Sequence, residues 1–228
     1  MRFPGLTDPR RYRDILLQRI RADLKAAPFK ILDIGGIDRP LLEKDPSYQY
    51  DGLDIDEKED CYKIYDNFIV QSVEEPIDRS YDMIISITLL EHVRDNRASV
   101  RSKFEALRPG GVTHHYIPSK YHPYSLCLRL VGPKLQRILI PILRPGSEGE
   151  TGYPAFFDHC STQQMSKLFR NVGFEKIDVV PFYNANDYFA FLTPAWVIVV
   201  LFEYICLKFD LELFASGFVI SAEKPASV

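Results

Sequence analysis

The segment "ILDIGGIDRP", residues 31–40, carries an acid, Asp33, shortly before two glycines, Gly35 and Gly36. Glycines lack a Cβ atom, so a ligand can approach the backbone N–H groups of this turn closely, and an anionic group can bind there. A second acid, Asp54, follows at a spacing where a carboxylate can accept hydrogen bonds from both hydroxyls of a ribose. These residues predict a site for a ligand that contains a nucleoside.

The charge of the turn restricts that ligand further. A phosphate-binding loop needs a lysine, but the first lysine after the glycines is Lys44, beyond the turn, and no Gly-Lys-Ser/Thr sequence occurs. Asp33 adds negative charge, which disfavours a pyrophosphate and favours a ligand with both an ammonium and a carboxylate group. The methionine end of S-adenosylmethionine carries this pair of charges.

Three histidines, His92, His122 and His159, are candidates for a general base. A methyl group on a sulfonium is already electrophilic, so a base is needed only if the acceptor must lose a proton. A carboxylate or an acidic phenol would need none, and His92 has an equal claim to a structural role in the turn after a strand. Asp158 and His159 follow an irregular stretch and are candidates to face the acceptor. No His-x-x-x-His pair or carboxylate cluster occurs, so we predict no metal.

Composition limits the possible classes of protein. The chain has 228 residues, a net charge of -3 and a pI of about 6.0, values that argue against a dedicated DNA-binding protein. Its length predicts a single domain, residues 1–228, with insertions at about 120–150 and 184–214. Four dispersed cysteines without a Cys-x-x-Cys pair, and no signal-peptide pattern, indicate a reducing cytoplasm.

Strands and helices alternate along the chain. We expect a first helix within residues 7–27, with Asp8 as its N-cap and Pro9 at its first position. Compact apolar runs predict strands at 29–34, 48–56, 67–73, 81–87 and 112–118. A short helix after the glycine turn should end before Pro46, and a longer one should run from about Arg97 to Leu107, closed by a turn at 108–111. This alternation is typical of βαβ units.

Six segments together resemble the class I S-adenosylmethionine-dependent methyltransferases, especially the small-molecule and lipid-pathway branch with a Leu-Glu-His-Val motif. They are "ILDIGG", "YDGLDID", "SYDMIISITLLEHVRD", "ALRPGGVTHHYIPS", "MSKLFRNVGFEKIDV" and "SGFVISAEKP". The resemblance implies a Rossmann-like α/β fold, with a mostly parallel seven-stranded sheet, helices on both faces and an antiparallel last strand. It also implies S-adenosylmethionine as cofactor.

Carried over position by position, the resemblance implies that Asp33, Gly35 and Gly36 surround the methionyl part and that Asp54 binds the ribose. The other positions that it implies are Ile55 packing on adenine, Gln71 and Ser72 near the adenine amino group, and Ser86 and Thr88 beside the sulfur. Ile37 and Arg39 depart from the family, because they stand where its turn usually has glycines.

The predicted function is methyl transfer to a small-molecule or lipid-linked acceptor. The alternatives are an RNA or protein methyltransferase and a non-catalytic binding protein that retains the fold. An alternative hypothesis gives Asp33 and Asp54 structural roles, as helix caps or ion-pair partners.

Two segments bear on partners. Residues 120–147 combine lysines and arginines with leucines and isoleucines and contain no acid, which indicates a basic segment at a membrane surface, a lid over an apolar acceptor, or a solvated helix pair. Residues 188–214 are strongly apolar but too short to span a bilayer. Packing inside the fold, a homodimer interface and shallow membrane insertion could each cover them.

Overall fold

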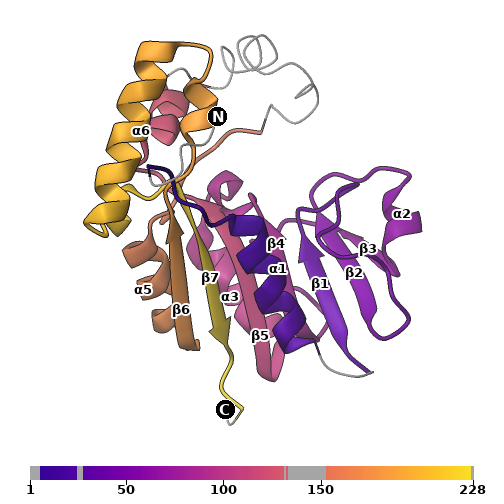
Figure 1. Ribbon diagram of the computed structural model, residues 1–228. Helices are drawn as coiled ribbons and strands as arrows, with labels where there is room; N and C mark the ends of the chain where they lie inside the picture. Colours follow the sequence, from indigo (N-terminus) through magenta and orange to yellow (C-terminus); the bar gives the residue numbers. More distant parts are fainter. Residues whose placement is uncertain (1–5, 25–27, 131, 133–152, 227–228) are drawn as a thin grey trace.

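A computed structural model describes residues 6–24, 28–130, 132 and 153–226 (Figure 1). Its strands are β1 (Lys30–Ile34), β2 (Gln49–Asp54), β3 (Asn67–Val70), β4 (Tyr81–Ile87), β5 (Leu107–Pro118), β6 (Glu175–Phe182) and β7 (Gly217–Glu223). Its α-helices are α1 (Tyr12–Asp23), α2 (Cys61–Ile64), α3 (Asn96–Ala106), α5 (Thr162–Val172) and α6 (Thr193–Lys208). Short 3-10 helices are η1 (Leu90–His92), η2 (Asn186–Phe189) and η3 (Glu212–Phe214), and residues 123–130 are also helical.

All seven strands form one sheet in the order β3-β2-β1-β4-β5-β7-β6. Neighbouring strands from β3 to β5 are parallel, whereas β7 runs antiparallel to both β5 and β6. The predicted mostly parallel sheet with an antiparallel last strand is therefore confirmed. Because the parallel strands are buried on both faces, β1 and β4 are almost continuously apolar.

Helices cover both faces of the sheet, as expected. The α1 helix buries Leu16 and Ile20 against one face, together with Ile31 and Met83. On the other face, α3 and α5 contribute Val100, Met165 and Phe169 to a second apolar cluster. The α6 helix and η2 lie beyond the carboxyl ends of the parallel strands, between β6 and β7 in the chain (Figure 1).

Three local predictions were wrong. Asp8 does not cap α1, which begins at Tyr12 with Arg11 at its N-cap. Asp8 is instead buried and accepts hydrogen bonds from the backbone and side chain of Arg10, the latter over 2.8–2.9 Å, and from the Tyr183 backbone N–H over 3.3 Å. A tertiary ion pair has therefore replaced the local cap.

No helix forms between Gly36 and Pro46. The Leu41 N–H donates to the Asp33 carboxylate over 2.9 Å, and the Leu42 N–H donates to the Tyr50 hydroxyl over 3.2 Å. Side chains of the sheet thus bind the N–H groups that a helix would use. Likewise, residues 108–111 do not form the predicted turn that closes the helix before them, because they already belong to β5. They form a bulge in β5, since Tyr81 pairs with Leu107 but Met83 pairs with Val112.

Candidate functional site

The carboxyl ends of β1, β2 and β4 meet at one edge of the sheet. Ile34 of β1 pairs with Leu53 of β2 on one side and with Ser86 of β4 on the other. The Gly35 N–H donates to the Leu53 carbonyl over 2.9 Å, so the glycine turn lies directly beside Asp54. The structure therefore brings together the two parts of the chain that the sequence predicted to share a ligand.

Both glycines of the turn are required by its geometry. Gly35 has φ +85°, in the left-handed region, and a Cβ atom there would lie 2.9 Å from Leu89 Cδ1. A Cβ atom on Gly36 would lie 2.3 Å from the Tyr65 hydroxyl. Ile37, which departs from the family pattern, has φ +44°. A β-branched residue in this region is strained by roughly 1–2 kcal/mol, so the turn keeps a glycine-like backbone without the third glycine.

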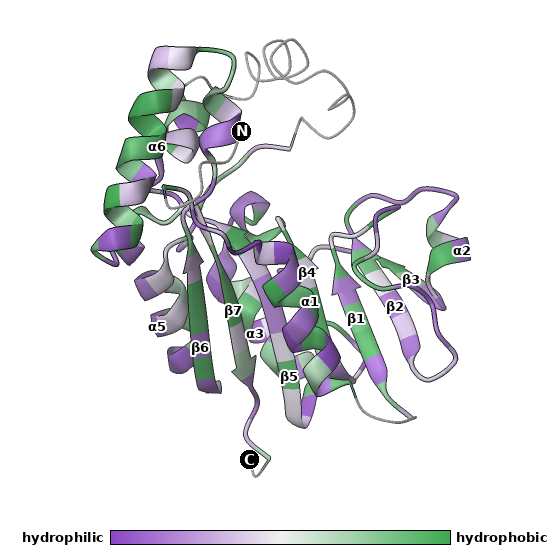
Figure 2. Ribbon diagram, viewed as in Figure 1, coloured by the Kyte–Doolittle hydropathy of each residue, from purple (hydrophilic) through white to green (hydrophobic). Residues whose placement is uncertain are grey.

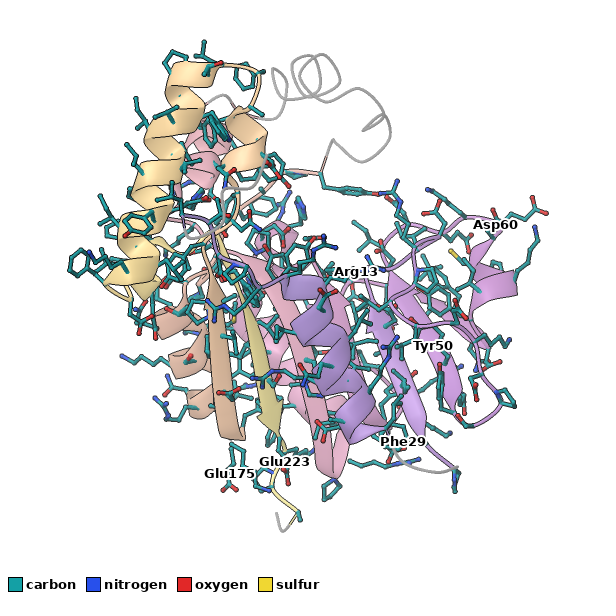
Figure 3. All side chains as sticks on the ribbon, in the orientation of Figure 1. Arg13, Phe29, Tyr50, Asp60, Glu175 and Glu223 are labelled. Atoms are coloured by element: carbon teal, nitrogen blue, oxygen red, sulfur yellow. The ribbon has the colours of Figure 1, made fainter. Side chains whose placement is uncertain are left out.

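Asp33 lies under this turn as a buried and incompletely paired carboxylate. Its Oδ2 atom accepts hydrogen bonds from the Leu41 N–H and the Tyr50 hydroxyl, whereas Oδ1 has no partner among the described residues. Burial raises the pKa of Asp33 to about 6, and the hydrogen bonds from Leu41 and Tyr50, followed by the cation of Arg13, partly oppose that rise. Figure 3 shows Arg13 on α1 and Tyr50 on β2.

The Tyr65 hydroxyl, on the other side of Gly36, is also buried without a partner among the described residues. An unpaired acceptor, Asp33 Oδ1, and an unpaired donor thus flank the glycine turn. This pair of groups fits a ligand that carries an ammonium, which the acceptor would bind, and a carboxylate, which the donor would bind.

The end of β2 holds the residues predicted to bind ribose and adenine. Asp54 is buried, its Oδ1 atom accepts the Asp56 N–H over 3.0 Å, and burial raises its pKa. Ile55, directly after it, is 57% exposed and so presents an apolar surface at this edge. The Gln71 N–H donates to the Asp54 carbonyl over 3.0 Å, and its side-chain NH₂ group donates to the Pro76 carbonyl over 3.2 Å. Ser72 accepts the Glu74 N–H.

Ser86 and Thr88 differ in accessibility. Ser86 is buried, and its hydroxyl lies 2.7 Å from His115 Nδ1. Thr113 donates its hydroxyl proton to the Ile84 carbonyl, so Thr113 Oγ1 must accept from His115 Nε2–H over 2.5 Å. Burial lowers the pKa of His115 well below its usual value, so the ring is neutral and Ser86 donates to Nδ1. The Ser86 hydroxyl can therefore only accept a hydrogen bond from another group. Thr88, by contrast, has an exposed side chain.

His92 follows β4 at the same edge. Its Nδ1 atom lies 3.2 Å from the Pro154 carbonyl, which can only accept, so Nδ1 carries the proton and Nε2 is the basic nitrogen. Burial lowers the pKa of His92, which keeps the ring neutral near pH 7. Nε2 lies 3.7 Å from a carboxyl oxygen of Glu91. His92 therefore has the tautomer and charge state that a general base requires.

His159 is held differently. Its Nδ1 atom lies 2.7 Å from Asp158 Oδ1, and the other Asp158 oxygen accepts the Asn96 N–H over 2.9 Å. The side chain is 33% exposed. Because the Asp158 carboxylate accepts the proton of Nδ1, the other ring nitrogen, Nε2, is left as the basic atom. His159 is therefore a second histidine that could act as a general base.

His122 lies in the interior. Its side chain is fully buried, its Nδ1 atom accepts the Tyr124 N–H over 3.2 Å, and its Nε2 atom is 3.2 Å from Glu203 of α6. Within the described part of the chain, no hydrogen bond or ion pair joins it to His92 or His159. Its contacts instead connect the segment after β5 to α6.

Two features of this edge are absent from the set of residues predicted from the sequence. Glu91 is buried, burial raises its pKa to about 8, and its Oε2 atom has no partner among the described residues. Tyr153 donates its hydroxyl to Asp56 and places its ring 6.2 Å from that of His92, so it spans the ends of β2 and β4. The Leu-Glu-His-Val motif pointed to Glu91, but nothing near Tyr153 in the sequence indicated its contacts.

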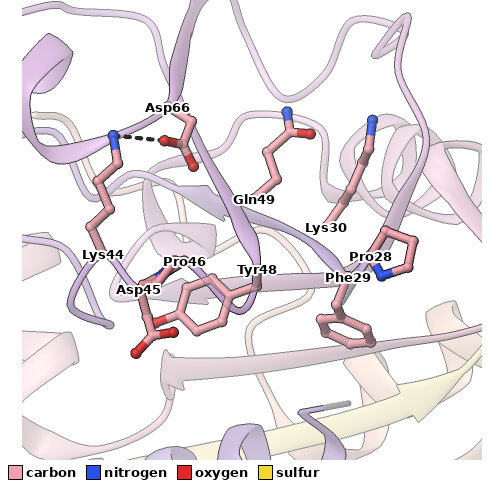
Figure 4. A pocket seen from close by; sticks show the side chains of 9 residues that line it. All are labelled: Pro28, Phe29, Lys30, Lys44, Asp45, Pro46, Tyr48, Gln49 and Asp66. Atoms are coloured by element: carbon pink, nitrogen blue, oxygen red, sulfur yellow. Dashed lines mark ion pairs between the residues drawn. The ribbon is translucent and has the colours of Figure 1, made fainter. Parts of the chain in front are cut away.

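A separate hollow of about 530 Å³ opens at the opposite edge of the sheet (Figure 4). It is lined by residues at the start of β1 and β2, among them Phe29 and Gln49, and by an ion pair of 2.6 Å between Lys44 and Asp66. None of the predicted cofactor residues lines it. Within the described ranges, no group of three or more His, Cys, Asp and Glu side chains could hold a metal ion.

Comparisons with known proteins agree with this geometry. A family model described as "Methyltransferase domain" matches residues 7–179, well over half of the chain. No curated protein matches the chain.

Three solved structures show the same fold at low sequence identity. A phosphoethanolamine N-methyltransferase 2 of Haemonchus contortus, in complex with S-adenosyl-L-methionine, is 13% identical with a TM-score of 0.54, over 93% of this chain and 52% of that chain. A possible histamine N-methyltransferase of Thermotoga maritima is 17% identical with a TM-score of 0.56, over 93% and 88%. A methyltransferase of Archaeoglobus fulgidus is 17% identical with a TM-score of 0.55, over 93% and 94%.

The chain thus spans about half the length of the Haemonchus contortus protein. The predicted cofactor, S-adenosylmethionine, agrees with the matched family and with the ligand of that structure. The match over residues 7–179 confirms the predicted enzyme class: the chain belongs to the methyltransferase domain family.

Proposed function

We propose that this protein transfers a methyl group from S-adenosylmethionine to a small-molecule or lipid-linked acceptor at the carboxyl edge of β1, β2 and β4. The observation that carries the proposal is the unpaired Oδ1 atom of buried Asp33, beside a turn with two obligatory glycines and next to Asp54. An ammonium group at Oδ1 would complete the pairing of that carboxylate.

Each of the predicted residues binds a different part of the cofactor. Asp33 and the N–H groups of Gly35 and Gly36 hold the methionyl part, and Asp54 accepts from the ribose hydroxyls. Ile55 packs on adenine, whose amino group is bound by Gln71, since the Gln71 NH₂ group is already used by Pro76 and its amide oxygen is left to accept. Ser72, Ser86 and Thr88 complete the set, with Thr88 at the open edge.

The bound cofactor supplies an electrophilic methyl group on a sulfonium. The work of the protein is then to hold the acceptor in line with that methyl group and to exclude water. The segment 153–157 suits this task, because Tyr153 contacts Asp56 and His92, and the Glu91 carbonyl accepts the N–H groups of Phe156 and Phe157 over 2.8 and 3.0 Å. It covers the edge where the acceptor would lie.

For an acceptor that must lose a proton, His92 is the base that the geometry favours. Its Nδ1–H is fixed on Pro154, its neutral state is maintained by burial, and Nε2 is left to accept. His159 is the second choice, because the Asp158 carboxylate holds its Nδ1–H and likewise leaves Nε2 to accept a proton. His122 has both ring nitrogens in contact with protein groups, so we assign it a structural role in the cover, by which we mean residues 183–216 together with the segment 119–130 after β5.

The acceptor class and setting are parts of the same proposal. The relatives with small acceptors include a Haemonchus contortus structure that holds phosphomonomethylethanolamine and S-adenosylhomocysteine. Residues Leu90–Val93 carry the Leu-Glu-His-Val motif on which we place the chain in the small-molecule and lipid-pathway branch. The four cysteines are free, which suits a cytoplasmic protein.

Isothermal titration calorimetry with S-adenosylmethionine and S-adenosylhomocysteine tests the proposal. We expect binding of both at micromolar concentrations and, for Asp33→Asn, a loss of at least tenfold in affinity. A screen of cofactor consumption over amines, quinone precursors, glycans and fatty acids then identifies the acceptor. The absence of binding at millimolar ligand would contradict the proposal and favour a protein that has kept only the fold.

A further inference from the structure

Four tyrosines from separate parts of the chain form two stacked pairs. Tyr116, near the end of β5, stacks on Tyr12 at the start of α1, with the ring centroids 3.7 Å apart. In the cover, Tyr124 stacks on Tyr188 of η2, with the centroids 3.9 Å apart. We call these four residues the tyrosine cluster.

The two pairs lie near each other and near Glu91. Burial raises the pKa of Tyr116 well above its ordinary value, and the charges that four neighbours can carry add to that rise, namely those of Tyr12, Tyr188, Glu91 and Tyr124. Because such interactions weaken with distance, these side chains belong to one region, in which the sheet, α1 and the cover meet.

The tyrosine cluster adjoins the position predicted for the reacting methyl group. The Thr88 N–H donates to the Tyr116 carbonyl over 3.1 Å, and Ile87 pairs with Tyr116 across β4 and β5. The rings are not sealed from solvent, since Tyr12 and Tyr188 are 36% and 42% exposed. A small molecule can therefore reach the cluster beside the proposed cofactor site.

Glu91 brings an unpaired carboxyl group to this region. Its side chain is buried, and its Oε2 atom has no hydrogen-bond partner among the described residues. Burial raises the pKa of Glu91 to about 8, and only a hydrogen bond from its own backbone N–H opposes that rise. Its neighbour at 3.7 Å, His92, is kept neutral near pH 7 by burial. A cation bound at Oε2 would offset the cost of burying this carboxylate.

Aromatic rings and a carboxylate together suit a cationic ligand. The face of a tyrosine ring carries partial negative charge and attracts an ammonium group within about 6 Å of its centroid. The cover above the cluster is largely apolar, and Figure 2 shows hydrophobic colour along most of α6, so the attraction acts in a region of low polarity. Among the described residues, α6 included, no helix has the length and apolarity needed to cross a bilayer.

We propose that the methyl acceptor is an amine, which binds as an ammonium ion between Glu91 and the tyrosine cluster. This inference rests on the proposed methyl transfer and names the chemical class of its acceptor. A phenol or a carboxylic acid would gain nothing from this arrangement, because its anion would be repelled by the Glu91 carboxylate and by the ring faces.

The same residues account for the proton and for the product. The bound ammonium gives one proton to Nε2 of His92, the base at this edge, and becomes a free amine. The amine nitrogen then attacks the methyl carbon, so that an N–C bond forms, the S–C bond breaks and its electron pair stays on sulfur. The methylated product is again a cation, which Glu91 and the rings hold until it leaves.

Two probes of the same length test the charge. Butylamine is a cation at neutral pH, whereas 1-butanol is uncharged. In protein saturated with S-adenosylhomocysteine, a titration followed by saturation-transfer NMR should show at least tenfold tighter binding of butylamine. Equal affinity, or binding of neither probe, would overturn the proposal. If S-adenosylhomocysteine itself did not bind, the proposed function would fail, and this inference would fail with it.

Variants then test the residues. Glu91→Gln keeps the shape of the side chain but removes its charge, so butylamine should bind at least tenfold more weakly while the affinity for S-adenosylhomocysteine changes less than twofold. Tyr188→Leu should weaken butylamine binding about threefold to fivefold, whereas Tyr188→Phe keeps the ring face and should bind as the wild type does. Tyr62→Leu, at an exposed tyrosine of α2 outside the cluster, is the matched control.

Wild-type affinity for butylamine in Glu91→Gln would overturn the role of the carboxylate. An equal loss in Tyr188→Leu and Tyr188→Phe would overturn the role of the ring face. Cofactor consumption separates the two sources of such an ammonium, because a free amine needs only to be in solution, whereas a lipid headgroup would react as micelles of lysophosphatidylethanolamine. Turnover of phenols or fatty acids, without turnover of either amine, would overturn the proposal.

Discussion

Two buried carboxylates, Asp33 at the β1 edge and Glu203 on α6, are satisfied to different degrees. Glu203 has donors from Ala185 and Asn186 and a contact with His122, so both of its oxygens are bound within the protein. Asp33 has donors on Oδ2 only, and Oδ1 is buried without a partner among the described residues. Burying a carboxylate without full pairing costs stability, so the difference favours a structural role for Glu203 and is consistent with the proposed ligand-binding role of Asp33.

The backbone shows the same contrast. Ile37, in the turn after β1, has φ +44°, and Thr88, in the turn after β4, has φ +49°. Strained residues that persist in a fold often mark functional positions. By contrast, none of the residues of α6 has a positive φ. Substitutions on the two sides should therefore have different effects.

The largest effect is expected for Glu203→Ala. The substitution leaves the donors of Ala185 and Asn186 unpaired in the interior and removes the carboxylate beside His122 Nε2, so we expect a loss of about 3–5 kcal/mol, confined to the cover. Hydrogen exchange should rise in residues 183–216 while β1 and β4 stay protected. Glu105→Ala, at an exposed glutamate of α3, is the control. Unchanged exchange in the cover would mean that Glu203 is not structural.

Asp54→Ala should weaken S-adenosylmethionine binding by about 2–3 kcal/mol, the scale of hydrogen bonds to a charged group. Asp54→Asn should be milder, since one acceptor oxygen remains. Calorimetry on both variants measures the effect, and circular dichroism controls for folding. Wild-type affinity in Asp54→Ala would show that the ribose does not lie at the end of β2.

The affinity for S-adenosylmethionine should depend on pH through Asp33. Its pKa is raised to about 6, and only the ionised form attracts an ammonium, so affinity should fall as pH drops from about 7 through 6. The loss should approach tenfold per pH unit below 6. Asp33→Asn should bind weakly and remove this dependence, while any contribution from Asp54 remains. Equal affinity at pH 5 and pH 8 would contradict the role of Asp33.

The sequence predicts the sheet better than it predicts the cover. Residues 81–87 were predicted as a strand with the observed bounds of β4, because an apolar run bounded by polar residues is typical of a strand buried on both faces. The proximity of Asp33 and Asp54 also follows from sequence, since parallel neighbours end at the same edge. The pairing of His122 with Glu203 could not be predicted, because it depends on how two distant segments pack.

Tertiary contacts also explain the local errors. Asp8 has the sequence pattern of an N-cap, but its carboxylate oxygens instead accept hydrogen bonds from the Arg10 side chain and the Tyr183 N–H. Similarly, the predicted helix before Pro46 loses its N–H groups to Asp33 and Tyr50. The basic segment at 120–147 lies mostly outside the described residues, so its predicted roles as lid or membrane contact stay predictions.

The smallest expected effect concerns backbone strain at Thr88. The residue is exposed, so its side chain contributes little packing, and its φ of +49° is unfavourable for a β-branched residue. Thr88→Asn should therefore raise the free energy of unfolding by about 0.5–1 kcal/mol, because asparagine tolerates this conformation. Thr88→Val keeps the β-branch and should give no gain. Chemical denaturation of the three proteins measures the difference. If the strained backbone at Thr88 contributes to cofactor binding, the stabilised Thr88→Asn variant should bind S-adenosylmethionine less tightly than the wild type. If Thr88→Asn gains both stability and affinity, the strain at this residue has no role in binding.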